Sequence, residues 1–252
     1  MERVGRLDRG DGVELKWAKL EGVSPTIVFL PGLRSKMASE KGKALLLFCT
    51  ERKQSLLRFD YSGHGASGGD FLAGSIDQWA ADAMSVIGAQ ARGESLILVG
   101  SSMGGWIALL TALKIPDRVC AIVGVAAAPD FTARRWESLS ADARRSLACD
   151  GFVSLPSRYG DAMVYSQALL QEGRGPHLLL EGASIPLSCP IRLLHGLKDE
   201  DVPWDVALRI ARQVASPDVA VTLIKDGNHR LSRPQDLDLL ARTLAALLPV
   251  PC

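Results

Sequence analysis

The chain has 252 residues, which suits one large domain or one domain with an inserted subdomain. Hydrophobic residues make up 47% of it and can bury a substantial core, whereas 23% charged residues and a formal net charge of +1 create no overall field favouring nucleic acid or an anionic membrane. The five cysteines are widely spaced and include no C-x-x-C pair, which argues against disulfides or a zinc site and predicts a reducing, cytoplasmic location.

The N-terminal region predicts a β-hairpin and no targeting segment. Residues 1–8 lack the apolar core of a signal peptide and carry acids that a transit peptide avoids. Further along the chain, no apolar run approaches the roughly 20 residues that span a bilayer. The hairpin is predicted from Val4–Leu7 and Leu15–Ala18, which bracket a polar turn.

Strand-like and helix-like segments then alternate along the chain, which predicts an α/β architecture. The strand-like runs are almost continuously apolar, as in a mostly parallel sheet covered by helices on both faces. The predicted strands are Thr26–Leu30, Ser55–Phe59, Leu96–Val99, Cys120–Val125, Ile191–Leu194 and Val219–Ile224. The predicted helices are Asp77–Gln90, Gly104–Leu113, Trp204–Val214 and Gln235–Leu248.

One long interval breaks this alternation between the fourth and fifth of these strands. It holds two helix-like stretches, Ser138–Ala148 and Ser157–Leu170, and is punctuated by Gly and Pro. A structureless loop of this length is improbable in a compact domain, so residues 129–189 are predicted to form a small helical cap. Residues 1–128 and 190–252 would then be the two parts of the core. The alternative is an ordinary crossover with long loops.

The segment Gly100–Gly104 carries the strongest chemical signal. Its sequence G-S-S-M-G matches G-x-S-x-G, and it lies between an apolar strand and an apolar helix. This context is that of a nucleophile elbow, a tight turn that exposes the hydroxyl of the central serine, Ser102.

A serine nucleophile needs a base, and the base needs an orienting acid. After Ser102, the chain supplies Asp199 behind one predicted strand and His229 behind the last one, in the order expected for this arrangement. All three lie beyond the C-terminal ends of parallel strands, where open α/β sheets place their ligand sites. Asp201 is the main rival for the acid, and His195 is expected to be structural.

Two backbone N–H groups are expected to stabilise the oxyanion, one from Met103 and one from Leu33 in the loop after the first parallel strand. Arg34 and His64 are candidates for the rim of the substrate site. Trp136 and Phe152, together with Phe131, Leu155 and Met163, either line the underside of the cap or pack it onto the sheet. No metal and no cofactor are expected.

Four segments of the chain resemble the α/β-hydrolase superfamily: Leu30–Gly32, Arg58–Ser67, Val99–Trp106 and Arg192–Asp199. The G-S-S-M-G-G-W stretch, the segment Pro190–Trp204 and the cap stretch Phe152–Tyr159 resemble the branch of mitochondrial palmitoyl-protein thioesterases within it. The resemblance implies the α/β-hydrolase fold and an S-depalmitoylating thioesterase and acyl-glucuronide esterase, acting through Ser102, Asp199 and His229. The missing presequence predicts a bacterial or processed relative.

The sequence therefore predicts a serine hydrolase of carboxylic esters or thioesters that works through an acyl-enzyme. Its substrate would be a small molecule or an acylated protein, and its assembly a monomer or small homo-oligomer. A C–C hydrolase or a cofactor-free haloperoxidase could use the same triad. A non-catalytic binding protein on this fold is a further alternative, because folds host many functions.

Overall fold

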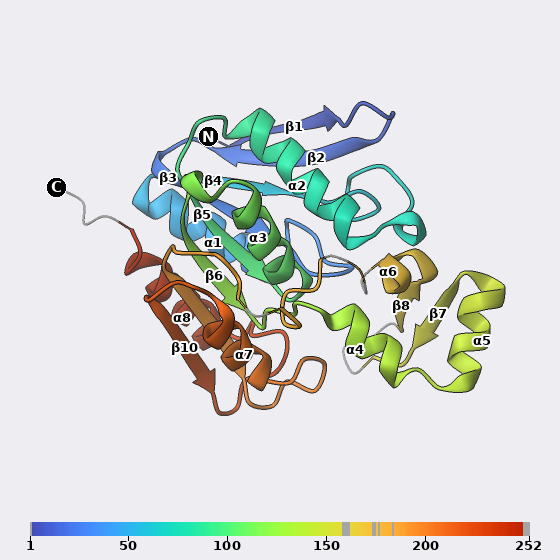
Figure 1. The fold of residues 1–252 in the computed structure, drawn as a ribbon. Helices are drawn as coiled ribbons and strands as arrows, with labels where there is room; N and C mark the ends of the chain where they lie inside the picture. The colour runs from blue at the N-terminus through green and yellow to red at the C-terminus, as the bar shows by residue number, and fades with distance from the viewer. Residues whose placement is uncertain (1, 158–161, 173–174, 176, 183, 249–252) are drawn as a thin grey trace.

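The computed structural model describes residues 2–157, 162–172, 175, 177–182 and 184–248. Its main strands are β1 (Glu2–Asp8), β2 (Glu14–Leu20), β3 (Val23–Leu30), β4 (Gln54–Phe59), β5 (Leu96–Ser101), β6 (Val119–Val125), β9 (Ile191–Gly196) and β10 (Val219–Ile224). They form one eight-stranded sheet in the order β1-β2-β4-β3-β5-β6-β9-β10 (Figure 1). β1, β2 and β4 pair antiparallel, and the pairs from β4 to β10 are parallel.

The predicted strands are confirmed, and their burial explains why their sequences are so apolar. Every residue of β4 is buried, as are the first five residues of β5. The edge strand β10 instead alternates between half-buried and exposed positions over its first four residues. The N-terminal hairpin forms as expected, with Leu7 opposite Leu15. The central strands are therefore the ones that both helical layers cover, and β10 is a partly exposed edge.

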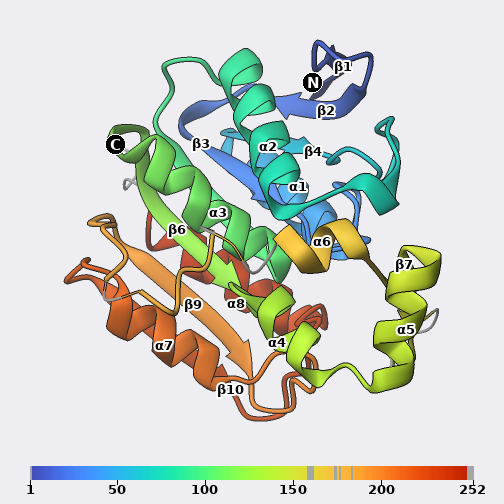
Figure 2. The ribbon, with the colours of Figure 1, turned by 45° about the vertical axis from the view of Figure 1, so that its right-hand side comes forward.

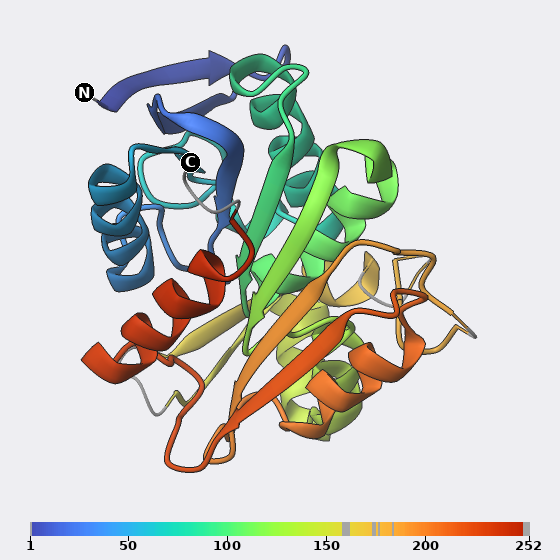
Figure 3. The same cartoon turned by 90° about the vertical axis from the view of Figure 1, so that its left-hand side faces the viewer.

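Helices cover both faces of the sheet (Figure 3). The helices α1 (Glu40–Arg52) and α8 (Pro234–Ala245) share one apolar cluster, and α2 (Ile76–Gln90), α3 (Met103–Lys114) and α7 (Asp205–Gln213) share the other. Short 3₁₀ turns, η1 (Phe71–Ala73) and η2 (Pro116–Arg118), complete this part. Four of the five helices follow the predicted patterns, which confirms the α/β-hydrolase fold class.

The helix α1 has no counterpart among the predicted elements. Its apolar residues form one continuous run, Leu45–Cys49, rather than a stripe of helical period. Leu45 and Cys49 are buried one turn apart, whereas Leu47 between them faces solvent. Ser39 caps the helix by accepting a hydrogen bond from the Gly42 N–H. The helix is therefore determined by its tertiary packing against β4 and α8, and not by an amphipathic pattern in its sequence.

The interval predicted as a cap holds α4 (Phe131–Ser138), α5 (Ala141–Asp150), β7 (Phe152–Leu155), β8 (Met163–Ser166) and α6 (Gln167–Glu172). In Figure 2, α4 and α5 lie beyond the arrowhead of β6. The helix predicted over Ser157–Leu170 is wrong where β8 pairs antiparallel with β7. The short run Met163–Ser166 has no helical stripe of its own, and cross-strand pairing satisfies its backbone. Residues 158–161 of that prediction lie outside the described residues.

Side-chain hydrogen bonds hold this interval in place. The indole N–H of Trp106 on α3 donates to the His177 carbonyl oxygen at 3.0 Å and joins the interval to the core. Within the interval, the Asp130 carboxylate near its start accepts from the backbone N–H groups of Leu179 and Leu180 near its end, at 2.9 and 2.7 Å. His177 itself lies 3.1 Å from the carboxylate of Asp77 on α2. In the part of the chain that the structure describes, no helix combines the length and apolar character needed to cross a membrane.

Candidate active site

The turn between β5 and α3 has the geometry of a nucleophile elbow. Ser102 adopts φ 54° and ψ −120°, a conformation that a non-glycine residue holds only under constraint. Its backbone N–H bonds to the Val125 carbonyl at 2.9 Å, which ties the turn to β6. A Cβ at Gly104 would lie 2.6 Å from the Pro31 carbonyl oxygen, so only glycine lets α3 begin this close to the preceding loop. The strain at Ser102 is thus fixed by its neighbours.

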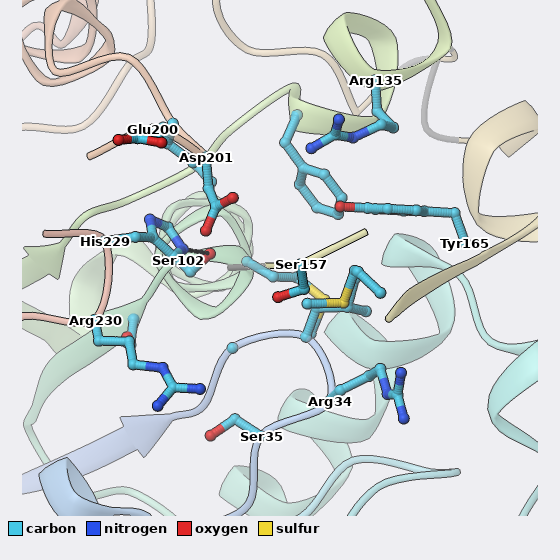
Figure 4. Close-up of a pocket in the computed structure, with 18 of the residues that line it drawn as sticks. Arg34, Ser35, Ser102, Arg135, Ser157, Tyr165, Glu200, Asp201, His229 and Arg230 are labelled. Carbon is cyan, nitrogen blue, oxygen red and sulfur yellow. Dashed lines mark hydrogen bonds between the residues drawn. The ribbon is translucent and has the colours of Figure 1, made fainter. Parts of the chain in front are cut away.

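The structure brings together the three residues that the sequence predicts as a triad. Figure 4 shows two of them, Ser102 and His229, side by side. The Ser102 Oγ lies 3.0 Å from His229 Nε2, and His229 Nδ1 lies 2.7 Å from Asp199 Oδ2. A carboxylate only accepts hydrogen bonds, so Nδ1 carries the hydrogen and Nε2 accepts from the Ser102 hydroxyl. His229 therefore stands in the tautomer that a general base requires.

Asp199 is held by more than His229. Its Oδ1 accepts from the backbone N–H groups of Asp201 and Val202 at 3.0 and 2.8 Å, and its Oδ2 lies 3.1 Å from Nε2 of His195. Burial alone would raise the pKa of Asp199, but the contacts with His195 and His229 and the Val202 N–H outweigh it and hold the pKa well below the usual range. Asp199 is therefore a stable anion. The rival Asp201 is exposed, and its backbone supports Asp199.

Two backbone segments border the Ser102 hydroxyl. Met103 is the first residue of α3, so its N–H has no acceptor within the helix. The loop after β3 lies directly against the elbow, because a Cβ on Gly32 would sit 3.1 Å from the Ser101 carbonyl oxygen. Leu33 follows in that loop and lines the same pocket as Ser102. The two residues predicted to supply the N–H groups of an oxyanion hole thus line one pocket with Ser102.

The triad opens into a pocket of about 710 Å³ between the core loops and the predicted cap. Such a volume suits a small-molecule ligand. One part of its wall is apolar, formed by residues of both regions: Leu33, Met103, Phe131, Leu155, Met163 and Val202. Charged side chains also line it, and the basic ones outnumber the acidic ones: Arg34, Lys41, Arg134, Arg135 and Arg230 against Glu40, Glu200 and Asp201.

Two features of this pocket were missed by the sequence reasoning. Lys41 on α1 is only 8% exposed, and its ammonium donates to the Arg230 carbonyl and to Ser232 Oγ, next to His229. Burial lowers the pKa of Lys41 to about 8. The guanidinium of Arg135 lies 5.0 Å above the ring of Tyr165, on the cap side of the pocket. No local motif marks either pair, because each joins elements distant in sequence.

Of the residues predicted to line the substrate site, some line the pocket around the triad and others lie elsewhere. Arg34 does line the pocket, and it donates to the Ala162 carbonyl at 2.6 Å, just before β8. Arg34 also lines a second cavity of about 430 Å³, together with His64 and Phe152, which are not among the residues around the triad. Trp136 lines neither, and its ring stacks under the guanidinium of Arg144.

His64 is 3% exposed, and its Nδ1 donates to the Ser62 carbonyl at 3.1 Å. Burial lowers the pKa of this imidazole. The rings of Phe71 and Trp79 meet it edge-on. His64 therefore belongs to an aromatic cluster under the loop 60–72.

One group of potential metal ligands occurs among the described residues. Asp199, Asp201 and His229 place one ligand atom each within 4.8 Å of one another. In this group His229 Nδ1 already bonds Asp199 Oδ2, and Nε2 bonds the serine hydroxyl. The triad accounts for these contacts.

Comparison with known proteins agrees with this fold. The model of the family "Serine aminopeptidase, S33" matches residues 25–157. The rat protein named mitochondrial palmitoyl-protein thioesterase ABHD10 is 38% identical over 242 residues, which cover 96% of this chain and 81% of the relative.

Two solved structures cover almost the whole chain. A protein of Agrobacterium vitis S4 superimposes with a TM-score of 0.92 at 35% identity, covering 99% of both chains. Mouse α/β-hydrolase domain-containing protein 10 superimposes with a TM-score of 0.88 at 36% identity, covering 97% of this chain and 98% of the other. The resemblance seen in the sequence is thereby confirmed: the chain belongs to the ABHD10 family of α/β hydrolases, and it is an ester or thioester hydrolase.

Proposed function

We propose that Ser102, His229 and Asp199 are the nucleophile, base and acid of this hydrolase. The observation that carries the proposal is the unbroken chain of hydrogen bonds from Ser102 Oγ through His229 to Asp199, at 3.0 and 2.7 Å, at the wall of the pocket. A lone serine hydroxyl is a weak nucleophile at neutral pH, and this arrangement supplies its activation.

In the first half-reaction, Ser102 Oγ attacks the acyl carbon while His229 Nε2 takes the hydroxyl proton. Asp199 stabilises the imidazolium that forms and keeps its Nδ1–H in place. His229 then gives the proton to the leaving alcohol or thiol, which departs from the acyl-enzyme. In the second half-reaction, His229 activates a water that releases the acid and restores Ser102.

The backbone N–H groups of Met103 and Leu33 would bind the oxyanion of each tetrahedral intermediate. Their donors belong to the elbow and to the loop packed against it, so they are oriented before substrate arrives. Preorganised donors of this kind contribute on the order of 3 kcal/mol each to lowering the barrier.

We further propose a fatty-acyl thioester on a protein or small molecule as the substrate, in a reducing compartment. The relatives named palmitoyl-protein thioesterase support this choice. Within the interval 129–189, which we treat as the cap, Phe131, Leu155 and Met163 present apolar surface to the pocket and suit an acyl chain. The basic side chains of the same pocket suit a leaving group with negative charge, such as the glucuronate released from an acyl glucuronide.

The test is a substrate panel that varies acyl length and leaving group, run on the wild type and on Ser102→Ala. Palmitoyl thioesters are compared with short p-nitrophenyl esters and with an acyl glucuronide. We expect the wild type to favour the long-chain thioester and Ser102→Ala to lose turnover by roughly 10⁴-fold or more.

A fluorophosphonate probe provides the control that needs no substrate. It should label the wild type and leave Ser102→Ala unlabelled. Equal labelling of the two would remove Ser102 as the nucleophile. Negligible turnover of every ester and thioester, beside cleavage of a C–C bond in a β-diketone, would replace the proposal with the C–C hydrolase alternative.

A further inference from the structure

The Asp199 carboxylate has a second histidine beside it that the triad does not use. His195 lies one residue before the end of β9 and is 1% exposed. Its Nε2 lies 3.1 Å from Asp199 Oδ2, the same oxygen that accepts from His229 Nδ1. Two imidazoles thus approach one carboxylate oxygen from two different strand ends.

The surroundings of His195 fix where its hydrogen lies. Nε2 faces two acceptors, the Val202 carbonyl oxygen at 3.1 Å and Asp199 Oδ2, so this nitrogen carries the hydrogen. Nδ1 is buried and has no hydrogen-bond partner among the described residues. A second hydrogen on Nδ1 would be a buried donor without an acceptor, which is costly. The neutral tautomer with its hydrogen on Nε2 is the one that fits.

We propose that His195 is a positioning residue for the catalytic acid, whose Nε2–H bridges Asp199 Oδ2 and the Val202 carbonyl and so orients the carboxylate toward His229. The inference rests on the triad proposed above. It assigns a role to a histidine that sequence reasoning regards as structural.

The contacts of the two carboxylate oxygens show why such a group is needed. Oδ1 is fixed by the N–H groups of Asp201 and Val202, which hold one corner of the carboxylate to its own loop. Oδ2 must be held in the direction of His229, which belongs to a different loop. His195 comes from the buried strand β9, so it provides a rigid reference for Oδ2 that neither loop can supply.

This role predicts a change in the ionisation of the triad. Among the described residues, the ionisable groups that face Asp199 are His195, His229 and Asp201. Without the N–H of His195, less of the negative charge on Oδ2 is compensated, and the imidazolium form of His229 is favoured. The loss of unprotonated His229 on acidification would then begin at a higher pH. A residue that only fills space would not move this ionisation.

The experiment compares His195→Phe, His195→Gln and His64→Phe with the wild type and with Ser102→Ala. Phe keeps a ring without an N–H, Gln restores a donor, and His64 is the matched control, a buried histidine that also donates to a backbone carbonyl. The measurements are the rate of fluorophosphonate labelling between about pH 5 and 9, and the low-field proton resonance of His229 Nδ1–H. The acid limb of the rate reports the ionisation of the base in the free enzyme.

For His195→Phe we expect labelling at the pH optimum to fall on the order of tenfold, the acid limb to move up by about one pH unit, and the resonance to shift. His195→Gln should bring the labelling rate, its acid limb and the His229 Nδ1–H resonance most of the way back to their wild-type values. His64→Phe should shift neither the acid limb nor the resonance. The inference would be overturned if both His195 variants kept the acid limb of the labelling rate and the His229 Nδ1–H resonance of the wild type. It would also be overturned if His64→Phe showed the same shifts as His195→Phe. If Ser102→Ala is labelled like the wild type, the proposed triad fails instead, which keeps the two failures distinct.

Discussion

The core sheet and the predicted cap, residues 129–189, line the same pocket but are built in different ways. In the core, Ser102 and Asp199 follow the largely buried strands β5 and β9, His229 follows the edge strand β10, and the loops that carry these residues bond to one another. In the cap, α4 and α5 bury one residue each among those described, Thr132 and Leu147. The core can therefore fix the positions of the catalytic atoms, whereas the cap presents a wall of side chains on short elements.

This difference suggests that the core carries out the reaction and that the cap selects the substrate. A triad needs fixed distances, and buried strands provide them. A pocket wall that selects an acyl chain only has to match the shape of that chain. Weakly packed elements can therefore form such a wall even if they open locally. Changes in the core should therefore affect all substrates equally, and changes in the cap should affect some substrates more than others.

The largest effect is expected from Asp199→Asn, which keeps the shape of the catalytic acid. The amide would favour the wrong His229 tautomer, and kcat should fall by roughly 10⁴-fold for every substrate. Steady-state kinetics on a short ester and on a long-chain thioester measure this. Asp201→Asn is the matched control, because the backbone N–H that Asp199 accepts is retained, and its loss should be far smaller. Equal losses in the two variants would contradict the assignment of Asp199.

Gly104→Ala should produce the largest loss of stability. Its Cβ would lie 2.6 Å from the Pro31 carbonyl oxygen, inside a region that cannot relax without moving the elbow. We expect the free energy of unfolding to fall by about 3 kcal/mol or more, measured by chemical denaturation. In the cap, Gly151 has φ 77° and no atom within 4 Å of a Cβ, so Gly151→Ala should cost only about 1 kcal/mol of backbone strain. A larger loss for Gly151→Ala would invert the comparison between the two regions.

The features that the sequence predicts are those marked by a local motif or pattern, and most of them lie in the core. The elbow, Asp199 and His229 could be predicted because each belongs to a motif or follows an apolar strand, and because their order is fixed. The strand β8 could not, since Met163–Ser166 is too short to show a period of its own and depends on pairing with β7. Lys41 could not either, because its partners at Arg230 and Ser232 are more than half the chain away. Local sequence patterns predict helices, strands and motifs, but they do not predict contacts between loops that are distant in the sequence.

Lys41→Met tests how the loop of His229 is held by the core. Because burial lowers the pKa of Lys41 to about 8, the unfolded chain binds more protons than the folded one between about pH 8 and the usual lysine range. The wild type should therefore gain stability relative to Lys41→Met as pH rises through this window, by up to about 3 kcal/mol. Denaturation between pH 7 and 10 measures it. Lys43→Met, at an exposed position on the same helix, is the control, and a constant difference across the window would contradict the buried charge.

The smallest effect is expected from Asp130→Asn, which loosens the cap without touching the triad. Asn tolerates the left-handed backbone at this position (φ 58°), so the change isolates the two hydrogen bonds from Leu179 and Leu180. The amide can accept only one of them, which should cost about 1–2 kcal/mol of stability. Because these bonds link the two ends of the interval that supplies the apolar wall, KM for a long-chain thioester should rise several-fold, while kcat/KM for p-nitrophenyl acetate stays near the wild-type value. Equal losses on both substrates would show that these bonds support the catalytic geometry as well, and the division between core and cap would then fail at Asp130.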